Sequence, residues 1–432
     1  MKKILSLFFV CLFVSACSGG GGVTERWKDR DPAGEAPRTL AIPHEKQMDP
    51  DAEEVETDYS GGLGPYANRD MAAIAGQMPN IPEASYVPPV KVAILLPLSG
   101  ESSALGQSML QAAQLALFDL GASTFELLPR DTQGTEEGAR VAAEQAIANG
   151  AQLILGPLFS TSVSAVKPIA ARSNVNVIAF STDWTLAGGN TYLMGFMPFG
   201  QVDTIARNIS GRGIGQIALI TTTDTYGTAV ERSLRDAARY NGFKISHTLR
   251  LPPQAIYGFG PQDVPAIQAS GAQGVLIAIG GHEAIHVSQV LDGAGLKAAV
   301  FPRFGTGLWD DPALAIEPTM QGARFAAPSP DMRRRFEENY SNVYGTAPIR
   351  LASLAYDATA LAAILGKNGE FDRTSQQYHP AYTRTDLLSP NGFAGIDGIF
   401  RFSGNNLVQR GLSVLEFRKN RIIEVDPAPR RF

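Results

Sequence analysis

One segment matches a catalytic pattern in both residue type and spacing, the H-E-x-x-H run at residues 282–286. Two histidines four positions apart share one face of a helix, where they can bind zinc while the glutamate acts as a general base. Gly280 and Gly281 precede the run and place it in the first turn of a helix. No third ligand is evident, because the remaining histidines are scattered at His44, His247 and His379. We favour a chance match and predict no metal, no cofactor and no enzymatic activity.

Other charged clusters carry no catalytic pattern either. No G-x-S-x-G turn, phosphate-binding lysine loop or C-x-x-C pair occurs in the chain. We interpret the acidic pairs at residues 310–311 and 337–338 as solvated or helix-capping side chains. The arginine triplet at residues 333–335 opens a predicted helix, and we interpret it as an exposed face rather than a phosphate site.

The two cysteines of the chain both lie near its start. Two lysines at residues 2–3 precede an apolar stretch at residues 4–14, and Val14-Ser15-Ala16-Cys17 follows. This order has the proportions of an export signal. The last four residues resemble the bacterial lipobox, which implies removal of residues 1–16 and acylation of Cys17; the alternative is an ordinary signal with an accidental cysteine. Loss of Cys11 with the signal would leave no thiol pair for a disulfide.

Residues 17–89 differ in composition from the rest of the chain. They combine a glycine run, scattered prolines and an acidic cluster, with few apolar residues at any regular period. Such a segment cannot bury enough surface to offset its ordering entropy, so we predict a disordered tether. The whole chain has a formal net charge of -5, which argues against a nucleic-acid-binding surface.

From residue 90 onward, short apolar runs alternate with amphipathic segments for more than two hundred residues. Continuous apolar strands between amphipathic helices predict parallel sheets covered on both faces, an α/β fold. The series pauses near residues 192–197 and then restarts, which predicts two lobes. Ligands of open α/β sheets bind beyond the carboxyl ends of the strands, so we expect a cleft between the lobes, lined by the loops that follow strands.

Several segments resemble known proteins. They are VAILLPLSG at residues 92–100, AQLILGP at 151–157, DTYG at 224–227, AYDA at 355–358 and GIFRFSG at 398–404. Together they resemble type I periplasmic binding proteins of the leucine/isoleucine/valine receptor class. The resemblance covers residues 90–425 and implies three crossovers between the lobes. It assigns residues 90–198 and 320–395 to lobe 1, and residues 199–319 and 396–425 to lobe 2.

Within that class, the opening segment and RLASLAYD at residues 350–357 are most similar to the carboxy-terminal domain of penicillin-binding protein activators. Those proteins are outer-membrane lipoproteins that stimulate peptidoglycan synthases by protein contact. The helical repeat domain of the enterobacterial activator has no counterpart here, because only the predicted tether precedes residue 90. Ser18 after the lipidated position implies, by the sorting rule of enterobacterial lipoproteins, an outer-membrane location facing the periplasm.

The resemblance also implies candidate ligand-binding residues. Hydroxyls and backbone amides of the first lobe would hold a ligand carboxylate, and an aromatic and an acidic residue of the second lobe would hold its ammonium group. The matching positions are Ser99, Gly100, Ser160, Ser181 and Thr182 in the first lobe, and Tyr226 and Glu283 in the second. The alternative is that the hydroxyls only cap helices, and that Phe159 and Trp184 fill the cleft.

Two functions therefore stand as hypotheses. The first is a non-enzymatic lipoprotein that activates or regulates a penicillin-binding protein, or another cell-wall synthase, by contact. The second is the substrate-binding receptor of an ABC importer for branched-chain or other amino acids. Both hypotheses place the protein at a membrane through its lipid anchor, and neither involves nucleic acid.

Overall fold

The computed structural model describes residues 38–39, 89–122, 124–375 and 377–432. The predicted signal peptide, with Cys11 and Cys17, and most of the predicted tether lie outside these residues. Two residues of the predicted tether, Arg38–Thr39, form the short strand β1. In the described part of the chain, no helix has the length and apolar character needed to cross a membrane.

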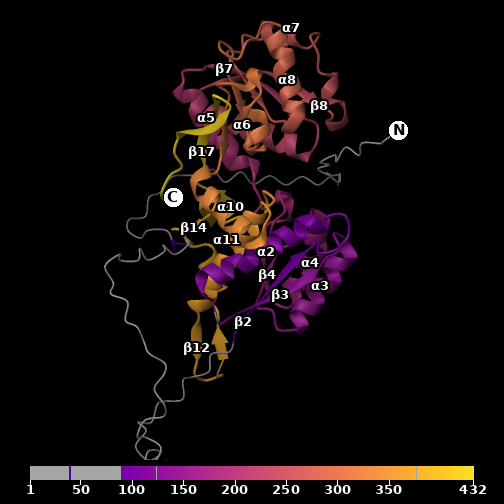
Figure 1. Ribbon diagram of the computed structural model, residues 1–432, viewed down its shortest axis with the longest axis vertical. Coiled ribbons are helices and arrows are strands. Elements are labelled where there is room, and N and C mark those ends of the chain that lie inside the picture. Colours follow the sequence, from indigo (N-terminus) through magenta and orange to yellow (C-terminus); the bar gives the residue numbers. More distant parts are fainter. Residues whose placement is uncertain (1–37, 40–88, 123, 376) are drawn as a thin grey trace, which may run out of the picture.

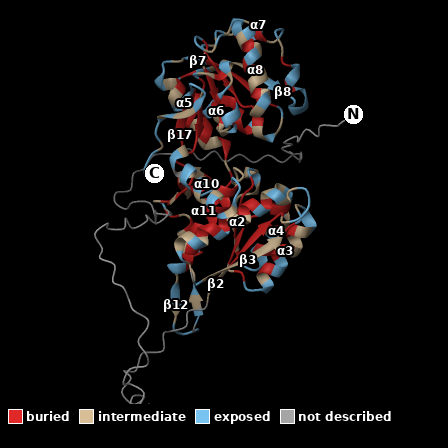
Figure 2. Ribbon diagram, viewed as in Figure 1, coloured by how far each residue is buried: buried red, intermediate tan, exposed pale blue. Residues whose placement is uncertain are grey.

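The first lobe is built on a five-stranded parallel sheet with strand order β3-β2-β4-β5-β6. Its inner strand β2 carries the sequence VKVAILL, which is buried almost throughout, so helices must cover both faces. The strands are β2 (Val90–Leu96), β3 (Phe125–Asp131), β4 (Leu153–Leu155), β5 (Asn176–Ala179) and β6 (Thr191–Leu193). The helices are α2 (Ser103–Leu120), α3 (Glu136–Ala148), α4 (Ser160–Arg172), α10 (Pro330–Tyr344) and α11 (Ala352–Lys367). Figure 2 shows the buried sheet between them.

The second lobe is built on a seven-stranded sheet with strand order β18-β17-β11-β10-β9-β7-β8. Alternate residues of its inner strand β7 enter separate apolar clusters, Ala218 and Ile220 in one and Ile217 and Leu219 in the other, so both faces are covered. The parallel strands are β7 (Gln216–Thr222), β8 (Lys244–Leu251), β9 (Val275–Ile277), β10 (Arg303–Gly305) and β11 (Arg324–Ala327), and β17 (Ser413–Arg418) and β18 (Arg421–Asp426) are antiparallel. The helices are α5 (Pro198–Gly211), α6 (Thr225–Asn241), α7 (Val264–Ala269), α8 (Gly281–Gly293) and α9 (Pro312–Ala315).

Smaller elements complete the two lobes. A four-stranded sheet joins β1, β14 (Phe393–Gly395), β15 (Gly398–Phe402) and β16 (Val408–Arg410), and a separate hairpin joins β12 (Glu370–Asp372) and β13 (Gln377–His379). The short helices are η1 (Trp184–Leu186), η2 (Pro253–Gly258), η3 (Gly307–Trp309), η4 (Pro318–Met320) and α12 (Arg384–Leu387). The predicted two-lobed α/β fold with parallel sheets flanked by helices is thus confirmed, and Figure 1 shows the lobes one above the other.

Two segments lie in the lobe opposite to the one expected. Strand β11, expected in the first lobe, pairs with β10 and β17 in the second, because its apolar Phe325 fills the core there. Strand β15, expected in the second lobe, carries Phe400 and Phe402, whose rings pack against Phe393 and Tyr192 of the first. Residues 298–300 form a turn, and β10 starts after it, at Arg303.

Three crossovers join the lobes, at residues 194–197, 328–329 and 411–412, between elements of the two cores. The first leaves from the end of β6 and the second from the end of β11, and each of these strands is parallel to its inner neighbour. The carboxyl ends of both parallel sheets therefore point toward the junction of the lobes. The loops that follow the strands are positioned where the two lobes meet.

Candidate functional site

Ser99 and Gly100 lie in the exposed loop after β2, and the Ser99 hydroxyl is already engaged. It donates to Asp131 Oδ2 at 2.6 Å, and the N–H groups of Leu98 and Ser99 donate to Oδ1 at 2.9 and 3.3 Å. Partial burial opposes ionisation of this carboxyl, but these hydrogen bonds outweigh it and hold the pKa of Asp131 below its usual range. The loop also needs Gly106, since a Cβ there would lie 2.1 Å from the Pro97 carbonyl oxygen.

Ser160 begins α4 directly after the β4 loop. Gly156 in that loop has a φ of +85°, and a Cβ on it would lie 2.3 Å from the Leu95 carbonyl oxygen, so the close turn requires glycine. Phe159 at the cap position offers no side-chain acceptor. Among the described residues, neither the Ser160 hydroxyl nor the N–H groups of residues 160–162 have a hydrogen-bond partner. This helix start can accept an anionic group.

Ser181 and Thr182 follow β5 and differ in their surroundings. Ser181 is buried, and its hydroxyl accepts a hydrogen bond from the N–H of Asp183 at 3.1 Å, so it shapes the turn. Thr182 is exposed, and its hydroxyl has no partner among the described residues. The ring of Trp184 packs edge-on against Phe199 of α5, with ring centroids 6.2 Å apart. That contact ties this loop of the first lobe to α5, which begins directly after the first crossover.

Tyr226 lies in the first turn of α6, which Asp224 caps by accepting the N–H of Gly227 at 2.8 Å. A Cβ on Gly227 would lie 2.0 Å from the Thr222 carbonyl oxygen, which explains the glycine of the DTYG segment. The Tyr226 hydroxyl lies 2.7 Å from the Thr306 hydroxyl after β10. Burial raises the pKa of Tyr226 well above its usual range, so this phenol stays protonated.

Glu283 lies in the first turn of α8, beyond β9, and is partly exposed. On the same helix, His286 Nε2 lies 2.9 Å from the carbonyl oxygen of Phe259, and its ring packs against the exposed Tyr257. His282 belongs to no group of three His, Cys, Asp or Glu side chains that could hold a metal ion among the described residues. Of the two H-E-x-x-H histidines, His286 thus contacts η2 and the chain after it.

The candidate residues fall into two separate groups. Those of the first lobe follow β2, β4 and β5, which are neighbours in the sheet, and those of the second follow the neighbours β7 and β9. Within the described ranges no hydrogen bond or ion pair joins the first group to Tyr226 or Glu283, nor Tyr226 to Glu283. The structure brings the members of each group to one edge of a sheet and leaves the groups apart.

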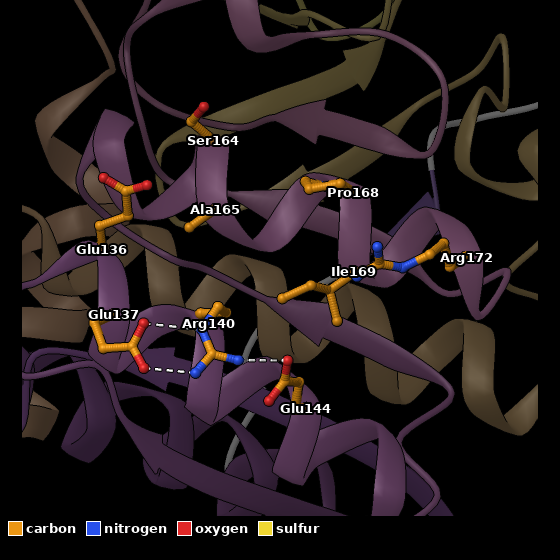
Figure 3. A pocket seen from close by; sticks show the side chains of 9 residues that line it. All are labelled: Glu136, Glu137, Arg140, Glu144, Ser164, Ala165, Pro168, Ile169 and Arg172. Carbon is orange, nitrogen blue, oxygen red and sulfur yellow. Dashed lines mark hydrogen bonds and ion pairs between the residues drawn. The ribbon is translucent and has the colours of Figure 1, made fainter.

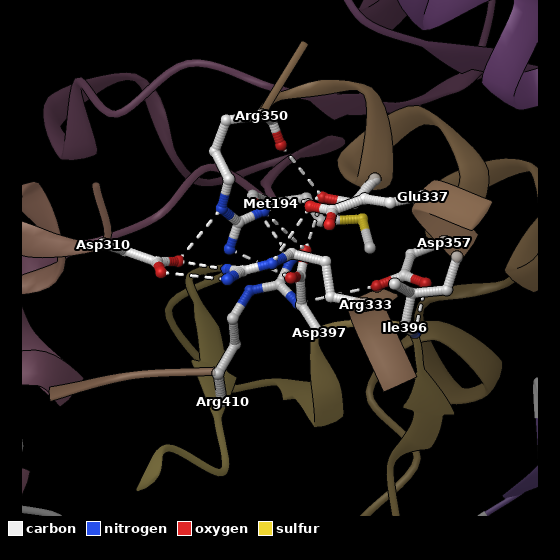
Figure 4. Close-up of polar contacts among 10 residues, drawn as sticks. Met194, Asp310, Arg333, Glu337, Arg350, Asp357, Ile396, Asp397 and Arg410 are labelled. Carbon is white, nitrogen blue, oxygen red and sulfur yellow. Dashed lines mark hydrogen bonds and ion pairs between the residues drawn. The ribbon is translucent and has the colours of Figure 1, made fainter. Parts of the chain in front are cut away.

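The sequence interpretation missed a cluster of buried charges at the crossovers (Figure 4). This hinge cluster comprises Asp310, Arg333, Arg350, Asp357, Asp397 and Arg410. The interpretation of Asp310 as solvated was wrong, since its side chain is 5% exposed. The exposed face predicted for residues 333–335 fails for Arg333, which is 13% exposed, and is confirmed for Arg334 and Arg335. Asp311, by contrast, caps α9 as predicted. The only sequence signal was the RLASLAYD segment, which holds two members of the cluster.

Two carboxyl groups of the hinge cluster, those of Asp357 and Asp397, have pKa values shifted in opposite directions. Burial, and then the negative charge of Asp397, raises the pKa of Asp357 to about 7. Burial would also raise the pKa of Asp397, but the guanidinium groups of Arg350 and Arg410 outweigh it and lower that pKa. Nε and Nη1 of the buried Arg410 make no hydrogen bond within the described structure, and the guanidinium lies over the rings of Phe196 and Phe400.

A hollow of about 470 Å³ lies on the outside of the first lobe, between α3 and α4 (Figure 3). Ala165, Pro168 and Ile169 of α4 form its apolar side, and the acidic first turn of α3 borders it. Near the crossovers, a space of only about 20 Å³ adjoins Phe196 and Arg410. The larger of these two hollows shares α4 with Ser160, but its lining starts one turn later, at Ser164, and includes none of the predicted ligand residues.

The sequence pattern of the family described as "Periplasmic binding protein" matches residues 89–406. A Leu/Ile/Val-binding protein homolog of Brucella abortus is 26% identical over 247 residues, which is 52% of this chain and 58% of that protein. An uncharacterized protein of Rickettsia prowazekii is 22% identical over 37% of this chain and 42% of its own length. The chain thus matches about half the length of these curated relatives.

Solved structures share the fold at low identity. A putative branched-chain amino acid ABC transporter protein from Rhodospirillum rubrum matches with a TM-score of 0.69 at 20% identity, covering 78% of this chain and all of that one. A leucine-, isoleucine-, valine-, threonine- and alanine-binding protein from Brucella ovis, in its closed conformation, matches with a TM-score of 0.62 at 18% identity. The match covers 80% of this chain and 95% of that one.

Proposed function

The chain belongs to the periplasmic binding protein family, and from that premise we propose that it is a non-enzymatic receptor for a small polar ligand bound between its lobes. The observation that carries the proposal is that the carboxyl ends of both parallel sheets point toward the junction of the lobes. Its relatives include proteins named for binding leucine, isoleucine and valine. We propose that this ligand is an amino acid and that the protein delivers it to an ABC importer.

The chemistry of the candidate residues supports an amino-acid ligand. A carboxylate suits the open start of α4, where the Ser160 hydroxyl and three N–H groups are free of partners among the described residues. Thr182 adds a free hydroxyl on the neighbouring loop, and Gly100 leaves the backbone after β2 accessible. On the second lobe, Glu283 supplies a carboxylate for the ammonium group, and the protonated Tyr226 supplies a hydroxyl.

A thermal-shift screen of amino acids tests this proposal. A ligand at about a hundredfold its Kd adds ~2.7 kcal/mol to the free energy of unfolding, a shift that such a screen resolves. Ser160→Ala should weaken a carboxylate ligand about tenfold or more, because a hydrogen bond to a charged group contributes about 1.5–3 kcal/mol. Ser164→Ala, on the same helix but bordering the outer hollow, is the matched control and should leave Kd unchanged. Failure of every amino acid to shift the midpoint would end the receptor proposal.

A second candidate is contact with a peptidoglycan synthase of the penicillin-binding class. It rests on the resemblance of the opening segment and RLASLAYD to activator lipoproteins, and one structural observation favours it. The hydroxyls of Ser99, Ser181 and Tyr226 are already bonded within their own lobes, whereas a hollow of about 470 Å³ is open on the outside of the first lobe. We propose that a synthase would dock there, with the chain anchored through Cys17 to the outer membrane and facing the periplasm.

Capture of penicillin-labelled proteins from detergent-solubilised envelopes tests this second candidate. The full chain, immobilised, should retain a band labelled by fluorescent penicillin. Ala165→Arg, which places a long charged side chain in the hollow, should abolish retention, while Ala269→Arg, at an exposed position of α7 on the other lobe, should not. Equal retention by both variants would exclude this docking face, and no retained band would exclude the synthase.

A further inference from the structure

Asp310 belongs to the second lobe but takes its partners from the first. Its neighbour Trp309 is fully buried in a core cluster of the second lobe. Arg333 lies on α10, where Phe336 of the same helix is packed in the core of the first lobe. Arg350 directly precedes Leu351, which packs against that same core. The ion pairs of Asp310 with Arg333 and Arg350 therefore span the two lobes.

The geometry of these contacts is that of strong ion pairs. Arg333 approaches Asp310 with two nitrogens, Nη1 to Oδ2 and Nη2 to Oδ1, the latter at 3.0 Å, and Arg350 Nε lies 3.1 Å from Oδ2. The carboxylate of Asp310 is 5% exposed, so water cannot replace a lost partner without cost. Both oxygens of one acid from the second lobe are thus held by two cations from the first.

Arg350 cannot follow Asp310 when the lobes move, because the first lobe fixes it independently. Its Nη2 lies 3.0 Å from Asp397 Oδ1, and its Nη1 donates to the Ser353 hydroxyl at 2.9 Å. Its guanidinium also lies 4.4 Å from the centre of the Phe196 ring, in the first crossover. A change in the angle between the lobes must therefore alter the pairs of Asp310 and not those of Asp397.

We propose that Asp310, Arg333 and Arg350 form an interlobe latch that selects the arrangement of the lobes seen in this structure. Breaking the latch leaves the desolvated carboxylate of Asp310 without a cation, so competing arrangements are disfavoured. The two arginines keep their partners within the first lobe, Glu337 for Arg333 and Asp397 for Arg350. Neutralising Asp310 removes that penalty and lets the lobes sample other angles. The latch depends on neither of the two proposed functions, since it needs no ligand and no partner.

Distance measurement between spin labels on the two lobes tests the latch. The full chain, with Cys11→Ser and Cys17→Ser, receives labels at Ala148→Cys on α3 and Ala266→Cys on α7, both at exposed positions. The parent should give one narrow distribution of interlobe distances by pulsed electron paramagnetic resonance. Asp310→Asn should widen that distribution about twofold or shift its maximum.

Two further variants decide the outcome. Arg333→Gln removes one partner of Asp310 and leaves Arg350 in place, so it should widen the distribution less than Asp310→Asn; if Asp310→Asn does not fold, Arg333→Gln alone decides. Asp331→Asn breaks an exposed pair with Arg334 within α10 and should leave the distribution unchanged. A parent-like distribution in the folded latch variants overturns the proposal, as does equal widening in Asp331→Asn.

Discussion

Arg140 on the outside of the first lobe and Arg350 at the hinge each lie between two carboxylates, but in opposite surroundings. Arg140 on α3 pairs with Glu137 and Glu144 of its own helix, whose side chains are 71% and 49% exposed (Figure 3). Arg350 pairs with Asp310 and Asp397, which are 5% and 0% exposed and come from different lobes (Figure 4). The ion pairs of Arg140 therefore join residues of a single helix, whereas the ion pairs of Arg350 join segments that are far apart in the sequence.

The largest effect expected from this difference is on stability. Arg350→Gln leaves the buried carboxylates of Asp310 and Asp397 short of one cation and removes the contact with the Phe196 ring. Breaking a buried ion pair from one side costs about 3–5 kcal/mol, and we expect about 3 kcal/mol here, because Arg350 itself is partly exposed. Urea denaturation followed by circular dichroism measures the loss.

Arg140→Gln is the matched control, because it also removes one guanidinium from between two carboxylates. Exposed pairs within a helix contribute little to stability, so its denaturation midpoint should stay within the error of the measurement. If the two variants lost equal stability, burial of the carboxylates would not make the ion pairs at the hinge stronger than those along α3.

The sequence predicted the fold well because strand and helix periodicity is a local signal. The apolar run of β2 and the glycines of the DTYG and LGP turns each follow from close packing that neighbouring residues dictate. The ion pairs of Asp310 carry no such local signal. Asp310 meets Arg333 and Arg350 across 23 and 40 residues of chain, and an acidic pair followed by a proline has the composition of a solvated turn. Likewise, nothing near Tyr226 identifies Thr306, 80 residues away, as its partner.

The second expected effect is a dependence of stability on pH, which arises from the buried Asp357 and not from exposed carboxylates. Its pKa in the folded protein is raised to about 7, so between about pH 4 and 7 the folded state keeps a proton that the unfolded chain has lost. The free energy of unfolding must therefore fall as pH rises through this window. Asp357→Asn removes the titrating group. Between about pH 5 and 8, the free energy of unfolding of this variant should therefore decrease by about 2 kcal/mol less than the free energy of unfolding of the parent does.

Denaturation of both proteins at four pH values across that range checks this prediction, with Asp372→Asn as the control. Asp372 is a partly exposed residue whose pKa is lowered by hydrogen bonds from Ser375 and nearby N–H groups, so it is ionised throughout the window. The control should reproduce the slope of the parent. Parallel slopes for parent and Asp357→Asn would mean that the proton on Asp357 is not retained near neutral pH.

The smallest expected effect is the salt dependence of the two arginine variants. Screening lengths fall from about 30 Å at ~10 mM salt to about 3 Å at ~1 M, and exposed pairs lose their interaction while buried pairs keep most of theirs. Any shift of the melting midpoint caused by Arg140→Gln should appear only at low salt, and the shift caused by Arg350→Gln should persist at ~1 M. If salt abolished the Arg350→Gln shift as well, solvent would have to reach Asp310 and Asp397, and the ion pairs across the hinge would be no stronger than those along α3.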